Sequence, residues 1–231
     1  MKILVIIPTR KEFGFFLKGC ADKQIRTKES RLGRLPIVEL PDLGITLSQG
    51  GLGKVQFAVH TQHLLDSCTD WDLVICAGAA GSIMDDVSIG DVVVSTETVE
   101  HDIINKAGTP IIPRFNSAEP KIAEFRSVSS VINGFKVHFG PIASGDEDIM
   151  DNERRSALHE LTGGLAVAWE GAGGARACRF NDTPFMEIRG ITDNACSNAV
   201  SDYWANLERV MGNVANLIMI WTREIKSKEN C

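Results

Sequence analysis

The chain has 231 residues, of which 44% are hydrophobic and 23% are charged, and its formal net charge is −6 at pH 7. This composition provides enough apolar residues for a sizeable core and excludes an intrinsically disordered chain. The acidic balance, with no block of Lys or Arg, excludes the charge pattern of a nucleic-acid-binding protein.

The sequence carries no evident signal for secretion or for a membrane. The first apolar run is too short for a signal peptide, and no stretch approaches the roughly 18 apolar residues of a membrane span, so we expect a soluble, cytoplasmic protein. The cysteines are widely spaced and predict reduced thiols rather than a disulfide framework. They are Cys20, Cys68, Cys76, Cys178, Cys196 and Cys231. His60 and His63 lack a nearby carboxylate partner, so no metal site is expected.

The first part of the chain predicts alternating strands and helices. Residues 3–7 form an apolar run that is typical of a strand buried on both faces, and Glu12 follows at the start of a short helix. Residues 21–34 are charged and contain glycine, which indicates a loop or a hairpin crossing. Two strands are expected after it, at residues 35–40 and 44–50.

A glycine-rich segment opens the next predicted helix. Gly50, Gly51 and Gly53 would let the backbone approach a ligand closely, and the helix should run to about Leu65. The spacing is not that of a P-loop, because no Ser or Thr follows Lys54. Tight packing between a strand and a helix is therefore the favoured interpretation.

Small residues follow the next predicted strand, at residues 72–78. Ala79 and Gly81 belong to this segment, which leaves room for a ligand at the strand tip. Glycine and proline make residues 105–118 an expected irregular loop. Phe115 in that loop is a candidate for a lid or for a contact with a partner subunit.

The remaining elements are read from apolar periodicity. They are strands at 90–98, 136–144, 165–169 and 185–191, and helices at 119–132 and 151–161. Ser201 is the expected N-cap of a last helix, whose apolar face is predicted to be core rather than ligand-binding. That face consists of Tyr203, Leu207, Val210, Val214, Leu217 and Trp221.

Two acids stand directly after predicted strands. Glu170 follows residues 165–169 and precedes a run of small residues at 171–175, and Asp193 follows residues 185–191. If the two strands are neighbours in a parallel sheet, both carboxylates face one crevice. Different surroundings would then keep one carboxylate ionised and the other available as an acid. The alternative is that each acid only caps the structure after its strand.

The order of these elements predicts one α/β domain over residues 1–231, without an internal repeat or a dividing linker. Five segments in order resemble the nucleoside phosphorylase/nucleosidase superfamily, and most closely the 5′-methylthioadenosine/S-adenosylhomocysteine nucleosidases. The segments are GGLGKVQFAVHTQHLL, VICAGAAGSIMDDVSIGDVVVSTETVEHD, ASGDEDI, VAWEGAGGARAC and FMEIRGITD. The resemblance implies a three-layer sandwich with a central mixed β-sheet flanked by helices, acting as a homodimer.

The resemblance also implies a reaction, the hydrolysis of the N-glycosidic bond of a purine nucleoside without a cofactor or metal. Glu12 matches the acid that activates the attacking water, and Asp193 the acid that protonates the leaving base. Glu170 matches the acid that binds the ribose hydroxyls, and Arg189 an arginine near the acids and the water. Ile149 matches the residue whose backbone pairs with the adenine edge.

Several residues depart from the family pattern. Asp148 stands where an aromatic residue often stacks on the base, and Ala79 where a serine is common near the water. Trp169 replaces a methionine beside the sugar. The segment at 105–115, which in the family helps to build the tail pocket with the partner subunit, is short here. These departures leave the reaction type standing and put the exact nucleoside in doubt.

Three other functions remain open. A phosphorolytic enzyme would need cations to hold phosphate, and Arg10 is the only candidate near the first strand, while Glu12 favours water. A futalosine-type hydrolase has asparagine at the position of Asp193, so adenine is the favoured base. The third alternative is a non-catalytic nucleoside-binding relative, which the changes at Asp148 and Ala79 would allow.

Overall fold

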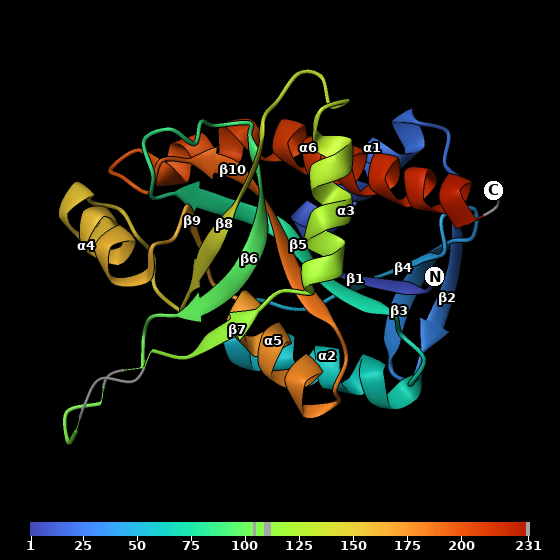
Figure 1. The fold of residues 1–231 in the computed structure, drawn as a ribbon, viewed down its shortest axis with the longest axis horizontal. Coiled ribbons are helices and arrows are strands. Elements are labelled where there is room, and N and C mark those ends of the chain that lie inside the picture. Colours follow the sequence, from blue (N-terminus) through green and yellow to red (C-terminus); the bar gives the residue numbers. More distant parts are fainter. Residues whose placement is uncertain (104, 109–111, 230–231) are drawn as a thin grey trace.

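A mixed β-sheet with helices on both sides forms the centre of the molecule (Figure 1). The computed structural model describes residues 1–103, 105–108 and 112–229. The strands are β1 (Ile3–Ile7), β2 (Lys28–Leu32), β3 (Leu35–Leu40), β4 (Ile45–Gln49), β5 (Leu73–Ser82), β6 (Val92–Glu100), β7 (Arg114–Asn116), β8 (Val137–Ser144), β9 (Ala166–Ala168) and β10 (Phe185–Asp193). The helices are α1 (Arg10–Asp22), α2 (Gly53–Ser67), α3 (Glu119–Ser129), α4 (Asn152–Thr162), α5 (Gly171–Phe180) and α6 (Ala199–Glu229). The predicted α/β class with a central mixed sheet is confirmed.

The sheet topology brings the ends of β5 and β10 together. The strand order is β10-β6-β8-β9-β5-β1-β4-β3-β2, and β7 pairs with β6. Because β10 also pairs with β5, the strands β5, β9, β8, β6 and β10 close into a ring. β10 runs parallel to β5, with Gly190 opposite Ala79 and Asp193 opposite Gly81. Residues that are more than 100 positions apart in sequence therefore meet at one edge.

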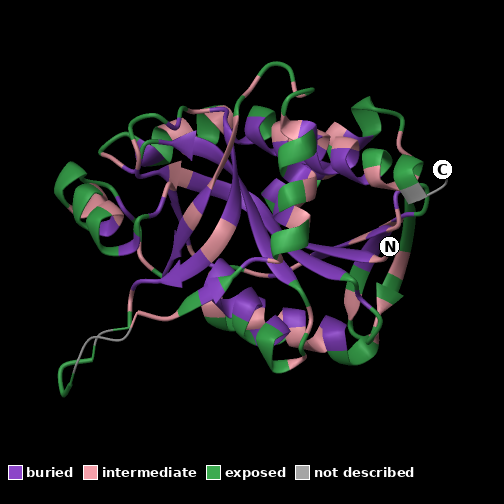
Figure 2. Cartoon of the chain, in the orientation of Figure 1, coloured by how far each residue is buried: buried purple, intermediate pink, exposed green. Residues whose placement is uncertain are grey.

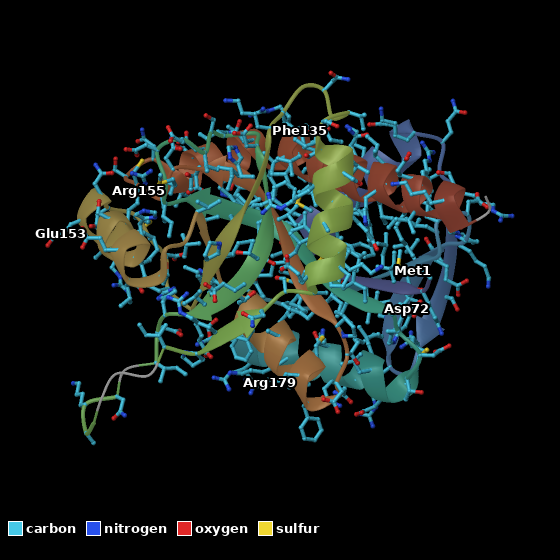
Figure 3. The ribbon with its side chains drawn as sticks, in the orientation of Figure 1. Met1, Asp72, Phe135, Glu153, Arg155 and Arg179 are labelled. Carbon is cyan, nitrogen blue, oxygen red and sulfur yellow. The ribbon has the colours of Figure 1, made fainter. Side chains whose placement is uncertain are left out.

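Helices cover both faces of the sheet (Figure 1). α1, α3 and α6 pack together on one side, and α2 and α5 pack together on the other. α4 lies beside β8 at the far end from the chain termini. Glu153 on α4 and Arg179 on α5 are exposed and project outward from these layers (Figure 3).

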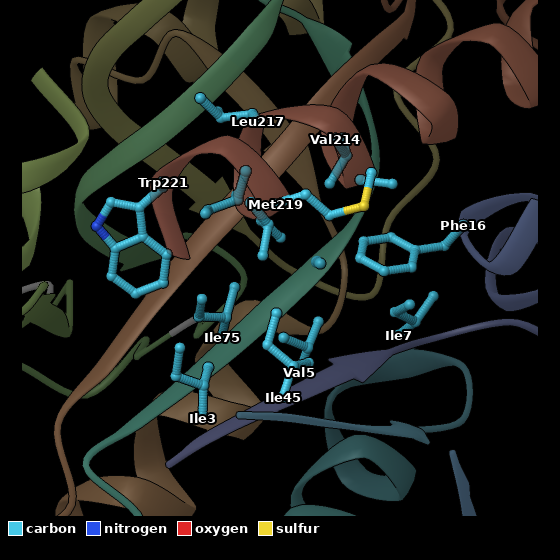
Figure 4. Close-up of a cluster of buried hydrophobic side chains, with 14 of the residues drawn as sticks. Ile3, Val5, Ile7, Phe16, Ile45, Ile75, Val214, Leu217, Met219 and Trp221 are labelled. Carbon is cyan, nitrogen blue, oxygen red and sulfur yellow. The ribbon is translucent and has the colours of Figure 1, made fainter. Parts of the chain in front are cut away.

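The burial pattern follows the layers, with buried residues concentrated in the sheet and on the inner faces of the helices (Figure 2). Every residue of β1 is buried, as the apolar run predicted. Ile3, Val5 and Ile7 pack in the cluster beneath α1 and α6 that Figure 4 shows, whereas Leu4 and Ile6 pack on the opposite side of the strand. Because side chains alternate along a strand, β1 contributes apolar residues to the core on each side of the sheet.

The predicted stripe on the last helix is core along most of its length. Leu207, Val210, Val214, Leu217 and Trp221 are each at most 1% exposed. The Trp221 ring stacks on Phe125 of α3 with 4.3 Å between ring centroids.

The start of that helix was predicted wrongly. α6 begins at Ala199, so Ser201 lies inside the first turn and donates a hydrogen bond to the Asn198 carbonyl instead of capping the helix. A hydroxyl that bonds backwards to a carbonyl is the usual alternative to capping for Ser near a helix start.

Two further expectations are refined by the pairing of the strands. Residues 21–34 contain β2, which pairs antiparallel with β3, so the hairpin is the alternative that the structure adopts. β9 and β10 are not neighbours, because β9 pairs with β5 and β8 while β10 pairs with β5 and β6. β9 runs parallel to β8 but antiparallel to β5, so Glu170 follows a strand that runs in the opposite direction to β5 and β10.

The segment expected as an irregular loop contains a short strand, β7, which pairs with β6. Residues 109–111 of that segment lie outside the described residues. Cys231 also lies outside them, and the cysteines found as free thiols are Cys20, Cys68, Cys76, Cys178 and Cys196. Within the described part of the chain, none of the helices combines the length and the apolar character needed to cross a membrane.

Candidate active site

A cavity of about 340 Å³ lies at the carboxyl ends of β5 and β10. This volume is within the range of pockets that bind small molecules. Its wall combines small residues, aromatic rings and carboxylates. The carboxylates belong to Glu12, Glu147, Asp148, Glu170 and Asp193. The structure thus brings together acids from α1, from β10, from the segment before α4 and from the start of α5.

Glu12 is held in place by the start of α1. Thr9 is the N-cap of this helix, and its side chain accepts a hydrogen bond from the Glu12 backbone N–H at 3.2 Å. Glu12 Oε2 accepts in return from the Thr9 N–H at 2.9 Å, which completes a capping box. The other oxygen, Oε1, accepts from the Ala79 N–H of β5 at 2.8 Å. The Glu12 carboxylate is therefore 3% exposed and has a fixed direction.

Glu170 is the N-cap residue of α5, but its side chain does not cap that helix. Glu170 Oε1 instead accepts from the Gly53 N–H at the start of α2, at 3.3 Å. Oε2 accepts from Arg189 Nη2 at 3.2 Å. Burial raises the pKa of Glu170 to about 7, although the Arg189 guanidinium opposes the shift. The simple capping interpretation fails for this residue.

Asp193 ends β10 at an irregularity in the register with β5. Such irregularities re-aim a side chain next to a functional site. Asp193 Oδ1 accepts from the Ala195 N–H at 2.9 Å, and Oδ2 accepts from the Thr192 hydroxyl at 2.9 Å. Burial raises the pKa of Asp193. Asp193 thus makes the local backbone contact that capping predicts, and it also lines the cavity.

Arg189 lies behind the cavity wall rather than in it. It is fully buried and donates to Glu170, to Cys76 Sγ at 3.1 Å and to the Ala79 carbonyl at 3.4 Å. A Cβ at Gly78 would lie 2.6 Å from Arg189 Nη1 and 3.0 Å from Glu12 Oε1, so both groups converge on this glycine. Arg189 can therefore influence the acids without touching a ligand.

The segment before α4 supplies another part of the wall. Ile149 is buried and Asp148 is exposed, and both line the cavity. Trp169 lies between this segment and Glu170, and its Nε1–H donates to the Glu147 carbonyl at 3.1 Å. Glu147 itself is paired with Arg154, which donates to Oε1 at 2.7 Å and to Oε2 at 2.6 Å. The pairing fixes the conformation of the segment that carries Ile149.

Ala79 and Gly81 line the cavity, as their position after a strand suggested. Gly81 has to be small, because a Cβ there would lie 2.7 Å from Asp193 Oδ1. Phe115 does not line the cavity. It lies on β7, buried at 8% exposure in the apolar cluster that includes Phe57 and Phe185. Within the described residues it belongs to the core, since β7 turns its ring inward.

Tyr203 and Trp204 at the start of α6 line the cavity although the sequence placed Tyr203 in the core stripe. Trp204 is 55% exposed and Lys11 lies over its ring, 4.2 Å from the centroid. The apolar periodicity of the helix concealed the role of Tyr203, because the stripe continues at this end past the core into the cavity. Trp204 lies outside the stripe and carried no signal of its own. Leu52 and Met150 line the same opening without any distinguishing motif.

The charge of the wall is one-sided. Of the described residues that line the cavity, five are acids and none is Lys, Arg or His. A bound phosphate requires positively charged Arg or Lys side chains, or backbone N–H donors, close to it. The cavity is therefore suited to a neutral or cationic ligand, and its acids can accept hydrogen bonds from hydroxyls or donate a proton when protonated.

The chain is similar to known proteins over nearly its whole length. The Phosphorylase superfamily model matches residues 2–223. The 5′-methylthioadenosine/S-adenosylhomocysteine nucleosidase of Geobacillus kaustophilus is 30% identical over 223 residues, which cover 92% of this chain and 91% of that protein. The solved nucleosidase of the same name from Neisseria meningitidis, in complex with methylthio-immucillin-A, superposes with a TM-score of 0.84 at 27% identity, covering 96% of this chain and 99% of that one. The futalosine hydrolase of Helicobacter pylori strain 26695 shares the fold, with a TM-score of 0.84, 24% identity and coverage of 97% and 98%.

Proposed function

The chain belongs to the phosphorylase superfamily, and from this premise we propose that it is a purine nucleosidase, a hydrolase that cleaves the N-glycosidic bond of an adenine nucleoside such as 5′-methylthioadenosine or S-adenosylhomocysteine. The products are the free base and a ribose derivative. One observation carries the proposal: Glu12, Glu170 and Asp193, from distant parts of the chain, line one cavity in three different environments.

Asp193 is the proposed general acid. Cleavage of the C1′–N9 bond leaves electron density on the purine, so protonation at N7 makes the base a better leaving group. Burial raises the pKa of Asp193, which favours the protonated carboxyl that this step needs. A correctly placed proton donor contributes about 10²–10⁴ in rate.

Glu12 is the proposed general base. The sugar becomes an oxocarbenium-like cation as the base departs, and a water molecule adds to C1′ while its proton passes to Glu12. The two backbone N–H groups that bind the oxygens of Glu12 support this role, since they fix the direction of its carboxyl group. Arg189 stands behind Glu12 and Glu170 and is proposed to set the charge balance of the two acids.

Glu170 is the proposed contact for the ribose hydroxyls, with Trp169 packing against the sugar. Its carboxylate lines the cavity, and each oxygen makes a single hydrogen bond longer than 3 Å, which leaves acceptor capacity for a ligand. Ile149 is proposed to pair with the adenine edge through its backbone, beside Asp148 and next to the small residues Ala79 and Gly81.

The one-sided charge of the wall favours hydrolysis over phosphorolysis. Phosphate would enter a cavity whose described lining residues include five acids and no cationic side chain. Arg10, the candidate considered from the sequence, is exposed and is not one of the lining residues. Water needs no such cation.

We further propose that residues 1–231 form one domain that acts as a homodimer in the cytoplasm, with a role in methionine salvage. The family model covers almost the entire chain, which supports one domain. The five described cysteines are free thiols, which supports a reducing compartment. The exposed apolar side chains Leu52, Val55 and Val59 at the start of α2 support a partner on that face.

The test is a panel of adenosine, 5′-methylthioadenosine, S-adenosylhomocysteine, inosine and futalosine, scored for free base with and without phosphate. We expect adenine release that does not depend on phosphate, and its loss in Glu12→Gln and Asp193→Asn with the fold retained. Strict phosphate dependence would identify a phosphorolytic enzyme in place of a hydrolase. Cleavage of futalosine and of no other compound in the panel would identify a futalosine hydrolase. Binding of adenine nucleosides without cleavage would identify a binding protein.

A further inference from the structure

Glu187 is a fully buried acid that the proposed mechanism does not use. It lies within β10 and is 0% exposed. Arg189 follows two residues later, so both side chains leave the strand on the same face. An acid is almost never fully buried unless it is paired. The partners of Glu187 therefore indicate why it is there.

The Glu187 carboxylate forms part of the floor beneath Glu170. Glu187 Oε1 accepts from Arg189 Nε at 3.1 Å and from Nη2 at 3.0 Å. Oε2 accepts from the Thr98 hydroxyl of β6 at 2.7 Å. A Cβ at Gly171, the residue after Glu170, would lie 2.0 Å from Glu187 Cδ. The first residue of α5 thus has to be glycine for this carboxylate to fit below it.

Arg189 is shared between two acids. The guanidinium donates to Glu187 through Nε and Nη2, and Nη2 also donates to Glu170 Oε2 at 3.2 Å. One positive charge therefore faces two carboxylates, and the closer, two-point contact goes to the acid that lies outside the cavity. Glu170, which lines the cavity, receives only one of the guanidinium hydrogen bonds.

We propose that Glu187 is a positioning residue, which binds the Arg189 guanidinium on the far side of Glu170 and so leaves Glu170 only partly paired and available to the nucleoside. The inference rests on the proposed role of Glu170 in substrate binding. If the charge of Glu187 is removed, Arg189 pairs mainly with Glu170. The Glu170 carboxylate is then occupied, and its ionised form is stabilised.

Titratable groups lie around Glu170 and around its partner Arg189. Arg189 on β10 and Glu12 on α1 act on the Glu170 carboxylate, Glu187 on β10 and Cys76 on β5 act on Arg189, and Tyr203 on α6 lies close to Glu170. Arg189 is the one cation in this set of described groups. Its pairing therefore determines how easily Glu170 ionises, and the pKa of Glu170, about 7, lies close to neutral pH.

The direct test follows the Glu170 carboxyl carbon by NMR in the full-length protein labelled with carbon-13 at glutamate Cδ. The resonance is assigned by its loss in Glu170→Gln. Glu187→Gln keeps an oxygen acceptor for Arg189 and removes the negative charge. We expect this variant to lower the titration midpoint of Glu170 by about one pH unit, the usual effect of an opposite charge at close range. An unchanged or raised midpoint in the folded variant would overturn the inference.

Thr98→Val provides a second variant in case Glu187→Gln does not fold. It removes the hydroxyl that donates to Glu187 Oε2, and the loss of this donor favours the protonated form of Glu187. The titration midpoint of Glu170 should therefore move in the same direction by a smaller amount. Ser95→Ala is the matched control. Ser95 lies on the same strand and is equally buried, but its hydroxyl accepts from the Glu187 backbone N–H at 2.8 Å and does not contact the carboxylate. An equal shift in the control would assign the effect to packing and overturn the inference.

Activity gives an independent readout. We expect Glu187→Gln to raise KM for the nucleoside about tenfold with a smaller change in kcat, because a binding contact is lost in substrate and transition state alike. If the wild-type protein releases no base, the proposed function fails and the NMR midpoint still decides the role of Glu187. If it releases adenine while the midpoint and KM are unchanged in the folded variants, the role of Glu187 fails and the proposed function stands.

Discussion

The two faces of β10 are equally buried but chemically opposite. Met186 and Ile188 point into the apolar cluster beneath α1 and α6, and both are 0% exposed. Glu187 and Arg189 alternate with them and lie under the cavity, at 0% and 1% exposure. One face is packed by hydrocarbon, whereas the other carries, between the apolar residues Phe185 and Ile191, an ion-pair network that reaches Glu170.

This difference shows that burial alone does not say what a residue contributes. Burying Ile188 removes apolar surface from water, which stabilises the fold by roughly 25 cal/mol per Å² at any pH. Burying Glu187 and Arg189 removes charges from water, and their attraction repays that cost only while both partners are present. Stability should therefore depend on pH and on pairing for the charged face, and on neither for the apolar face.

The largest effect is expected from Arg189→Met. This substitution leaves Glu170 and Glu187 buried without a cation, which should lower the free energy of unfolding by about 3–5 kcal/mol at pH 8. Urea unfolding measures the change. The loss should shrink at low pH as the two acids become protonated. The double variant Glu187→Met with Arg189→Met should be more stable than Arg189→Met alone, because it leaves one buried acid fewer without a cation. Equal stabilities would show that Glu187 and Arg189 do not offset the cost of burying each other.

Glu170→Gln should reveal the pH dependence of the charged face. The pKa of Glu170 is raised to about 7 in the folded protein, from its ordinary value of 4.5, so the folded state binds the proton more tightly. The resulting stabilisation is fully present below pH 4.5 and is lost as the pH rises through about 7. The loss amounts to roughly 3 kcal/mol.

The glutamine variant lacks this titration, so it should be more stable than the wild type above pH 7 and should lose activity. Urea midpoints between pH 4.5 and 8.5 test the expectation. A constant difference across this range would mean that Glu170 does not titrate as its burial indicates.

The chemical contrast between the two faces also marks what the sequence could predict. The apolar runs located nearly every strand, because continuous burial leaves a continuous pattern, and the terminal stripe from Leu207 to Trp221 is core as expected. The prediction of the helix start failed at Ser201, because its hydroxyl can either cap the helix or donate to a preceding carbonyl, and it does the latter. Strand adjacency could not be predicted, because β9 and β10 each pair with β5, which lies far from both in sequence.

The candidate site divides in the same way. Glu12, Glu170 and Asp193 were identified from their positions and from the family resemblance, and all three line the cavity. Glu187 was not identified, because an acid inside an apolar strand gives no sign of its partner until the fold brings Thr98 and Gly171 beside it. Tyr203 was concealed by its periodicity.

Ile188→Val is the apolar counterpart of the charged-face variants. Removing one buried methylene from this position should lower the free energy of unfolding by about 1 kcal/mol. Because no charge is involved, the loss should be the same at pH 5 and pH 8, and kcat/KM should be unchanged in the folded protein. A pH-dependent loss would mean that the two faces of β10 are coupled through the strand.

Asp148→Asn should have the smallest effect, because this acid is exposed at the cavity wall. Stability should change by less than about 0.5 kcal/mol. Removing one carboxylate should weaken the repulsion of anionic ligands, so the ratio of kcat/KM for a nucleoside carrying a carboxylate to that for adenosine should rise a few-fold at low salt and less at high salt. Asp86→Asn makes the same charge change at an exposed residue outside the cavity wall, and it should leave the ratio unaltered. An equal rise in both variants would assign the effect to the net charge of the protein. A rise confined to Asp148→Asn would show that the carboxylates of the cavity wall select against anionic ligands as far out as the mouth of the cavity.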